Sequence, residues 1–334
     1  KNGKILSEDY DAYRKEELFH GRSATLIKFF LDRELRPLLQ KMQNANISLE
    51  QMDDYLLARH AKEANAYIRK VNPDKSQNSG MTDKEADDFM KALPTSRRNA
   101  LDSISRDIDA ITKKTREIMV DTGLESQNTV NQWEKTYKNY VPLFREEIED
   151  GRPISLGRGF DIRGSTTRQR MGSSRKVVDV LANIAMQRER TIVRGEKNRI
   201  GKSLYGLILD NPHKGFWGVI NPEKMSKQAM RTELSNLGLD PNAVDDLVDR
   251  PPKKVINKST GLVSYEVPQA WKSAPNIFAT RINGEDRFMI FNKQDERAMR
   301  MVATLKSLDA QQQGEAIKMM GTAGDYYRKS IGGI

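Results

Sequence analysis

A glycine-rich basic stretch, VRGEKNRIGKSLYGL from Val193 to Leu207, holds residue types that could bind phosphate. Gly195 and the GKS triplet that begins at Gly201 resemble a phosphate-binding loop. That loop needs four residues between its first glycine and the triplet, because this length wraps backbone N–H groups around a phosphate. Here there are five, and an arginine-rich amphipathic pattern stands where a buried strand should precede the loop. We therefore do not expect a nucleotide site.

The same stretch partly matches the nucleotide-gripping helix of single-subunit RNA polymerases. Lys197 and Tyr205-Gly206 have the required spacing, but Val193 occupies the arginine position and Arg194 follows it. Two-metal catalysis also needs two positioned aspartates. The His-Asp dipeptide that usually carries the second one is absent from the chain. We predict a basic structural helix here, whose glycines allow close packing against another helix or a bend.

A calcium loop is suggested by DKSQNSGMTDKE, which places Asp74, Ser76, Asn78 and Glu85 at ligand positions. Ser79 stands where such a loop needs glycine for its sharp turn. Glu85 is also the residue that would complete a helix capping box with Thr82. We expect an ordinary loop between two helices.

Metal and acid–base chemistry have equally little support. His60 is followed one turn later by Glu63, but no further histidine or carboxylate completes a zinc set, so we expect a core or surface histidine. Paired acids are adjacent in sequence, which on a helix separates their directions by about 100°. The chain has no cysteine, which excludes thiolate ligands and disulfides. We predict no cofactor, no metal, no catalytic residue and therefore no enzyme.

Positive charge is the remaining signal. The chain has 56 Lys+Arg against 46 Asp+Glu, a formal net charge of +10, which favours an anionic partner. Aromatic residues are few, at 7%, so contact with phosphates or an acidic protein is favoured over base stacking. The residues predicted to make these contacts are Arg158, Arg163, Arg168, Arg170, Arg175, Lys176, Arg188, Arg190, Arg194, Lys197, Arg199 and Lys202.

The elements that would position these residues are mostly helices. Apolar residues recur at helical spacing through the first 141 residues, with capping boxes at Ser48 and Thr82. We expect a kink or a helix end near Pro37 and helix ends near Pro73 and Pro94. The longest pattern runs from Leu101 to Ile118 and predicts the seam of an antiparallel or coiled-coil pair, through which copies of the chain would associate.

From residue 253 to 292 the apolar period changes to two. KVINKSTGLVSYEV and IFATRINGEDRFMIF predict two hairpins, the second turning at Asn283-Gly284. The expected fold is mainly α, an elongated helical bundle with a small antiparallel β-hairpin insertion. Its expected parts are an N-terminal helical domain (1–141), a basic Gly/Arg-rich linker or loop (142–176), a basic helical segment (177–250), a small antiparallel β subdomain (251–292) and a C-terminal helix (293–334).

The sequence also indicates whether the chain has membrane-spanning or targeting segments. No stretch approaches the ~18 apolar residues of a membrane span, and no signal peptide opens the chain. We expect no integral membrane segment. Because the chain begins at Lys1 and ends in KSIGGI, we also expect it to be part of a longer protein.

Four stretches, in order, carry a resemblance to a known family. They are EELFHGR (Glu16 to Arg22), YLLARHAKEAN (Tyr55 to Asn65), SGMTDKEA (Ser79 to Ala86) and NYVPLFR (Asn139 to Arg145). With the following hairpin and helix, this order resembles the PLxRFG-type region of the very large polyvalent proteins of tailed bacteriophages and mobile elements. Pro142, Leu143 and Arg145 match the naming motif, whereas Glu146-Glu147 replaces its Phe-Gly.

The resemblance implies a segment of a virion-packaged protein that is injected into the host with or before the genome. It implies a structural role in virion assembly or in the DNA-ejection apparatus, with other virion proteins, copies of itself and DNA as partners. The implied location is the virion, then the host periplasm or cytoplasm. One alternative is an accessory, nucleic-acid-contacting part of a virion RNA polymerase or other ejected enzyme. Another is a stand-alone nucleic-acid-binding module.

Overall fold

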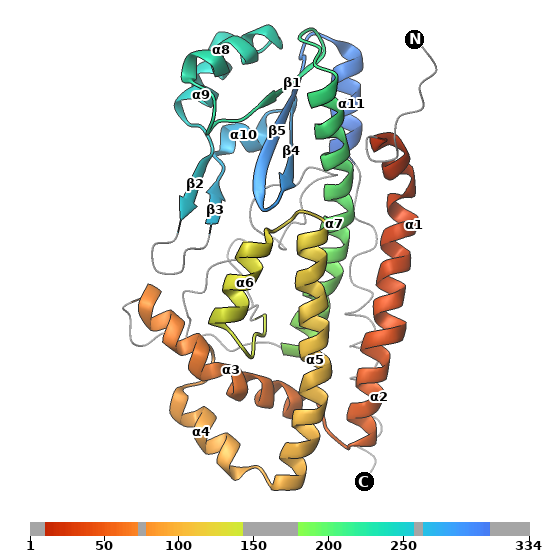
Figure 1. Ribbon diagram of the computed structural model, residues 1–334, viewed down its shortest axis with the longest axis vertical. Helices are drawn as coiled ribbons and strands as arrows, with labels where there is room; N and C mark the ends of the chain where they lie inside the picture. Colours follow the sequence, from red (N-terminus) through yellow and green to blue (C-terminus); the bar gives the residue numbers. More distant parts are fainter. Residues whose placement is uncertain (1–10, 73–77, 143–179, 257–262, 308–334) are drawn as a thin grey trace.

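The structure is a computed structural model that describes residues 11–72, 78–142, 180–256 and 263–307. It is mainly α-helical and elongated, with a small antiparallel sheet near one end (Figure 1). The helices are α1 (Ala12–Phe30), α2 (Arg36–Asn44), α3 (Leu49–Val71), α4 (Asp83–Ala92), α5 (Thr95–Asp121), α6 (Gln127–Thr136), α7 (Val180–Asp210), α8 (Lys227–Asn236), α9 (Pro241–Asp249), α10 (Gln269–Ser273) and α11 (Glu296–Ser307). The strands are β1 (Trp217–Ile220), β2 (Lys253–Ile256), β3 (Val263–Glu266), β4 (Ile277–Ile282) and β5 (Glu285–Phe291). The expected fold class is confirmed.

Both predicted capping boxes are present. The Ser48 hydroxyl accepts a hydrogen bond from the N–H of Gln51, whose side chain accepts one from the N–H of Ser48. Thr82 and Glu85 make the same reciprocal pair at the start of α4. Because each box satisfies two N–H groups that lack partners within the helix, it fixes where the helix begins.

The first helix reaches Pro37 through a π-helical turn. Residues Leu31–Leu35 form this turn, in which the N–H of Arg36 bonds to the carbonyl of Leu31. Pro37 then lies in the first turn of α2, directly after this wider turn, where its fixed φ angle suits a helix. The predicted interruption near Pro37 is therefore a wider turn, and helical structure continues through it.

The predicted seam of α5 is buried within the chain. Leu101, Ile104, Ile108 and Ile111 are all buried, and α5 packs against α2, α3 and α7. The seam therefore has its partners inside this molecule, which corrects the expectation that it joins copies of the chain. The spacing indicated helix packing correctly but could not distinguish an internal partner from an external one.

The described residues form two small sheets, both in the second half of this sequence. The first has the order β1-β5-β4 and is antiparallel, and the second pairs β2 with β3. Both hairpins match the sequence prediction, and Asn283 and Gly284 adopt the positive φ angles of 52° and 80° that such a tight turn requires. Strand β1 was not predicted, although the run FWGVI contains the aromatic and β-branched residues typical of strands.

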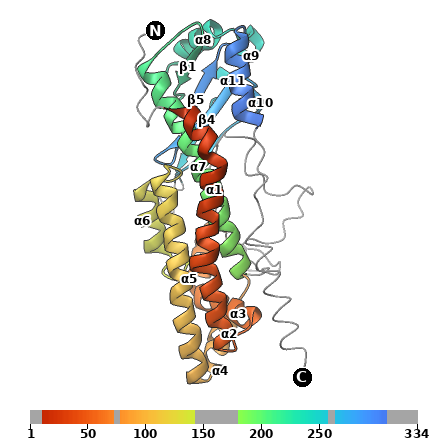
Figure 2. The same ribbon diagram turned by 90° about the vertical axis from the view of Figure 1, so that its right-hand side faces the viewer.

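The longest described helix, α7, runs along the long axis beside α1 and α5 (Figures 1 and 2). It contacts α1, α3 and α5 on the bundle side and β1 and β4 at the sheet. Phe278, Met289 and Phe291 join its hydrophobic core, whereas Phe288 and Ile290 pack into a second core with α8, α9 and α10. The alternation of strand residues thus gives the sheet two buried faces. None of the helices in the described ranges is sufficiently long and apolar for a membrane crossing.

Candidate functional site

The cations of α7 do not form an exposed basic face. Arg188 and Lys197 are buried, and the other four predicted contact residues of this helix are half-buried: Arg190, Arg194, Arg199 and Lys202. Because α7 is surrounded by helices and strands, its charged side chains face other parts of the chain. This corrects the expectation of a cationic helix surface. The six predicted contact residues of the linker, Arg158, Arg163, Arg168, Arg170, Arg175 and Lys176, lie outside the described residues.

Arg188 illustrates how α7 accommodates its charge. Its Nη2 lies 3.0 Å from Oε1 of Glu34, and its guanidinium carbon lies 5.5 Å from the centre of the Phe30 ring. Burial lowers the pKa of Arg188, and the neighbouring Glu34 carboxylate opposes that shift. The residue therefore ties α7 to the π-helical turn through an ion pair and a cation–π contact.

A second set of buried charges joins α7 to the β4–β5 hairpin. Arg281 on β4 lies between Asp286 (Nε to Oδ1, 3.7 Å) and Glu125 (Nη2 to Oε2, 3.6 Å), and all three are buried. Arg194 approaches the same group from α7. Burial, together with the like charge of Arg281, lowers the pKa of Arg194 to about 10, while Glu125 and Asp286 oppose the shift. The charges of Arg194 and Arg281 are therefore offset by two carboxylates, those of Glu125 and Asp286, which come from outside α7.

Asn198 lies beside these charges and uses its whole side-chain amide. Its Oδ1 accepts hydrogen bonds from the Oγ1 of Thr280 and the N–H of Arg281, each at 2.8 Å. Its Nδ2 donates to the carbonyl oxygens of Thr122 (2.8 Å) and Arg281 (2.7 Å). We call this set of contacts the α7–hairpin joint. The fully buried amide satisfies backbone groups of two segments that would otherwise have no partner.

The close approach of α7 to its neighbours also explains the two glycines Gly195 and Gly201. A Cβ on Gly195 would lie 2.7 Å from Cγ2 of Thr122, and one on Gly201 would lie 2.5 Å from Oγ1 of Thr280. These separations are too short for a side chain, so both glycines allow close packing, against the end of α5 and against β4. The helix continues unbroken through the GKS triplet, so no phosphate loop forms there.

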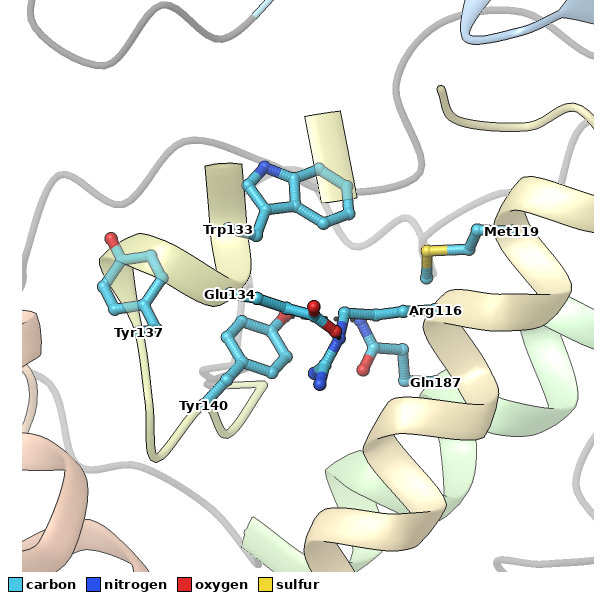
Figure 3. A pocket seen from close by; sticks show the side chains of 7 residues that line it. All are labelled: Arg116, Met119, Trp133, Glu134, Tyr137, Tyr140 and Gln187. Carbon is cyan, nitrogen blue, oxygen red and sulfur yellow. Dashed lines mark hydrogen bonds and ion pairs between the residues drawn. The ribbon is translucent and has the colours of Figure 1, made fainter. Parts of the chain in front are cut away.

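A hollow lined by aromatic residues lies between α5, α6 and α7 (Figure 3). We call it the aromatic hollow, and its lining consists of Arg116, Met119, Trp133, Glu134, Tyr137, Tyr140 and Gln187. The space that these side chains enclose is small, about 10 Å³, which is close to the size of one water molecule. The spacing of Trp133, Tyr137 and Tyr140 was a signal in the sequence, but it could not identify the residues that approach from α5 and α7.

Two charged residues meet inside this hollow. Nε of Arg116 lies 3.2 Å from Oε1 of Glu134, and its guanidinium carbon lies 6.0 Å from the centre of the Tyr140 ring. Gln187 donates a hydrogen bond to the Tyr140 hydroxyl at 3.3 Å. The Tyr137 and Tyr140 rings are 6.2 Å apart and tilted by 54°. The hollow thus combines aromatic faces, one carboxylate and a resident guanidinium.

Below the hollow, Glu63 fixes the segment that follows α6. Its Oε1 lies 2.8 Å from Nδ1 of the buried His60 and also accepts the N–H of Asn139 at 2.8 Å, while Oε2 accepts the N–H of Lys138 at 2.9 Å. Burial raises the pKa of Glu63, but the bonds from His60 and the two N–H groups outweigh it, so that the pKa is lowered overall. His60 is a core histidine, and within the described ranges no group of three metal-ligating side chains gathers.

Asn65 plays a similar part for the loop before α4. Its Nδ2 donates to the carbonyl of Met81 and to Asp83, and its Oδ1 accepts the N–H of Ser79. The stretch that resembled a calcium loop is thus held by an amide from α3, at least over its described residues. Asp74 and Ser76 lie outside them.

Comparisons of the chain with protein-family models, with curated proteins and with solved structures found no match.

Proposed function

We propose that this chain is a structural module of a large internal or ejected virion protein of a tailed bacteriophage. In this role it contributes to virion assembly or to the apparatus through which DNA leaves the particle. The proposal rests on the ordered motifs that resemble the PLxRFG-type region, and on what the residues of those motifs do in the fold.

Three of the four motif stretches are joined to one another by hydrogen bonds. Asn65 of YLLARHAKEAN holds Ser79 and Asp83 of SGMTDKEA. Glu63 of the same stretch holds the backbone N–H of Asn139, which begins NYVPLFR. Motifs whose residues bind one another by hydrogen bonds are typical of residues that stabilise a fold. This is the observation that carries the structural role.

The remaining stretch, EELFHGR, contacts the central helix. Nε of Arg22 lies 3.0 Å from Oε2 of Glu196, and Phe19 is buried in the core. Glu196 also pairs with Arg199 on α7 itself. The motif residues therefore stabilise the arrangement of α1, α3 and α7, which supports a scaffold whose outer surfaces are left for partners.

Particle composition tests the proposal directly. Gradient-purified virions of the phage that encodes the chain should contain it by mass spectrometry, and particles that have released their DNA should contain less of it. A matched sample of infected-cell lysate, freed of particles, controls for abundance. Detection in the lysate but in neither form of the particle would contradict the proposal.

The runner-up function is an accessory, nucleic-acid-contacting part of a virion RNA polymerase or another ejected enzyme. The net charge of +10 favours it, and so does the concentration of arginines in the linker. Because the α7 cations are engaged inside the fold, this function depends on the linker. Replacing those six cations should therefore abolish the affinity for DNA.

A further inference from the structure

We propose that the aromatic hollow binds an organic cation, such as a quaternary ammonium or a guanidinium group, in place of the Arg116 side chain. This inference does not rest on the proposed virion role. It follows from the lining residues and from the group that now occupies the space between them.

The lining has the chemistry that recognises such cations. Trp133, Tyr137 and Tyr140 line the hollow. Tyr140 and the Glu134 carboxylate lie beside Arg116, and Tyr137 lies further from it (Figure 3). The face of an aromatic ring carries negative charge, so several rings around one space attract a cation that is too weakly hydrated to stay in water. An anion would meet both these rings and the Glu134 carboxylate.

The resident Arg116 shows that a cation fits. Its guanidinium lies within the distance range of a cation–π contact with Tyr140, and it pairs with Glu134 through Nε. The Arg116 side chain is 16% exposed and the Glu134 side chain 43%, so water screens this ion pair mainly from the side of the carboxylate. A bound cation that takes over the contacts with Tyr140 and Glu134 replaces those that Arg116 gives up, and the departure of Arg116 enlarges a space that is otherwise small.

Gln187 keeps the remaining lining in place when Arg116 leaves. Its amide, on the rigid central helix, donates to the Tyr140 hydroxyl, so this ring remains oriented without help from the guanidinium. Tyr137 is held from behind by Tyr67 and His60, whose rings lie 5.6 Å from its own. An incoming cation thus meets a preformed set of rings.

Fluorine NMR on protein labelled with 5-fluorotryptophan provides the test. The chain has three tryptophans, so Trp133 can be assigned with a Trp133→Phe variant and followed separately from Trp217 and Trp271. Choline should shift the Trp133 signal saturably and leave the other two unchanged. Its uncharged analogue 3,3-dimethylbutan-1-ol, which has the same shape, should shift it much less.

Variants of single residues test which side chains determine the affinity for choline. Arg116→Ala, or Arg116→Met if the alanine variant does not fold, should bind choline about five-fold more tightly, the factor that corresponds to one vacated cation–π contact. Glu134→Gln should bind it more weakly. Arg106→Ala removes an exposed arginine of the same helix and should leave binding unchanged.

The source of the cation is distinguished by comparing free amines with peptides. Choline and agmatine represent small molecules, and short glycine-flanked peptides containing arginine or trimethyl-lysine represent a protein side chain. Tighter binding of the peptides assigns the hollow to a partner protein, and equal or weaker binding assigns it to a free amine. The proposal fails if neither wild type nor the Arg116 variants respond at tens of millimolar, or if the uncharged analogue acts as strongly as choline.

Discussion

Asn198 binds both the N–H and the carbonyl oxygen of Arg281, at 2.8 Å and 2.7 Å, so that one side chain on the central helix takes the place of a neighbouring strand for β4. The same amide also reaches the carbonyl of Thr122 at the end of α5. Three segments that are distant in sequence are therefore fixed by one buried group.

We expect Asn198→Ala to destabilise the protein by about 2–4 kcal/mol, because it leaves several buried backbone groups without a hydrogen-bond partner. Urea unfolding followed by circular dichroism measures this. Asn211→Ala is the matched control, since the side-chain amide of this exposed asparagine donates to the nearby carbonyl of Leu207, and its loss should change stability by less than about 0.5 kcal/mol. Equal effects of the two substitutions would show that the α7–hairpin joint does not stabilise the fold.

The glycines of α7 and α1 should respond in opposite directions to alanine. Gly201→Ala places a Cβ against Thr280 and should destabilise the protein by about 1–3 kcal/mol through overpacking. Gly21→Ala on α1 meets no atom within 4 Å and should stabilise it by up to about 1 kcal/mol through helix propensity. Thermal melts of both variants check this, and a stabilising Gly201→Ala would contradict the close approach of α7 to β4.

Replacing Arg188 should lower the stability of the protein and leave its affinity for DNA unchanged. Arg188→Met leaves Glu34 without its buried partner, although Lys114 remains 3.4 Å away, and we expect a loss of about 3 kcal/mol. Adding Glu34→Met should recover much of that loss, because the uncompensated charge is then removed.

DNA retention across a salt series separates this effect from nucleic-acid binding. The slope of log affinity against log salt should be unchanged in Arg188→Met and shallower when the six linker cations are replaced by glutamine. A folded Arg188→Met protein with a clearly shallower slope would mean that α7 does contact DNA.

Stability should fall in acid partly because of Glu63. Its pKa is lower in the folded protein than the ordinary value of 4.5, so the carboxylate contributes stability above about pH 4.5 that is lost as the pH falls through the folded-state pKa. Glu63→Gln should be less stable than wild type near neutral pH, and the difference should narrow below about pH 4. Unfolding curves over pH 3–7 measure this, with the exposed Glu117→Gln as control.

Local signals in the sequence were sufficient for most of the helices and both hairpins. Ser48, Thr82 and the Asn283-Gly284 pair act on neighbouring residues, so their effect is visible in the sequence itself. The short strand β1 was missed because four residues give little periodicity, and its place is set by pairing with β5. The π-helical turn was missed because Pro37 alone does not specify how the preceding turn adapts.

The position of charge could not be predicted in the same way. The arginines and lysines of α7 predicted a surface, whereas Glu34, Glu125 and Asp286, which pair with or surround them, come from other parts of the chain. The aromatic hollow likewise depends on Arg116 and Gln187 approaching from two helices. Such sites arise from tertiary contacts between residues that carry no mutual signal in the sequence.

The central place of α7 has a consequence for the order of folding during synthesis. Helices α1 and α5 emerge from the ribosome long before Val180 does, and until then their apolar faces lack the helix that covers them. Sheet strands β4 and β5 come later still, and they complete the other side of α7. The helices that precede α7 are therefore the part of the nascent chain most dependent on a chaperone, because their core closes only after Val180–Asp210 has been made.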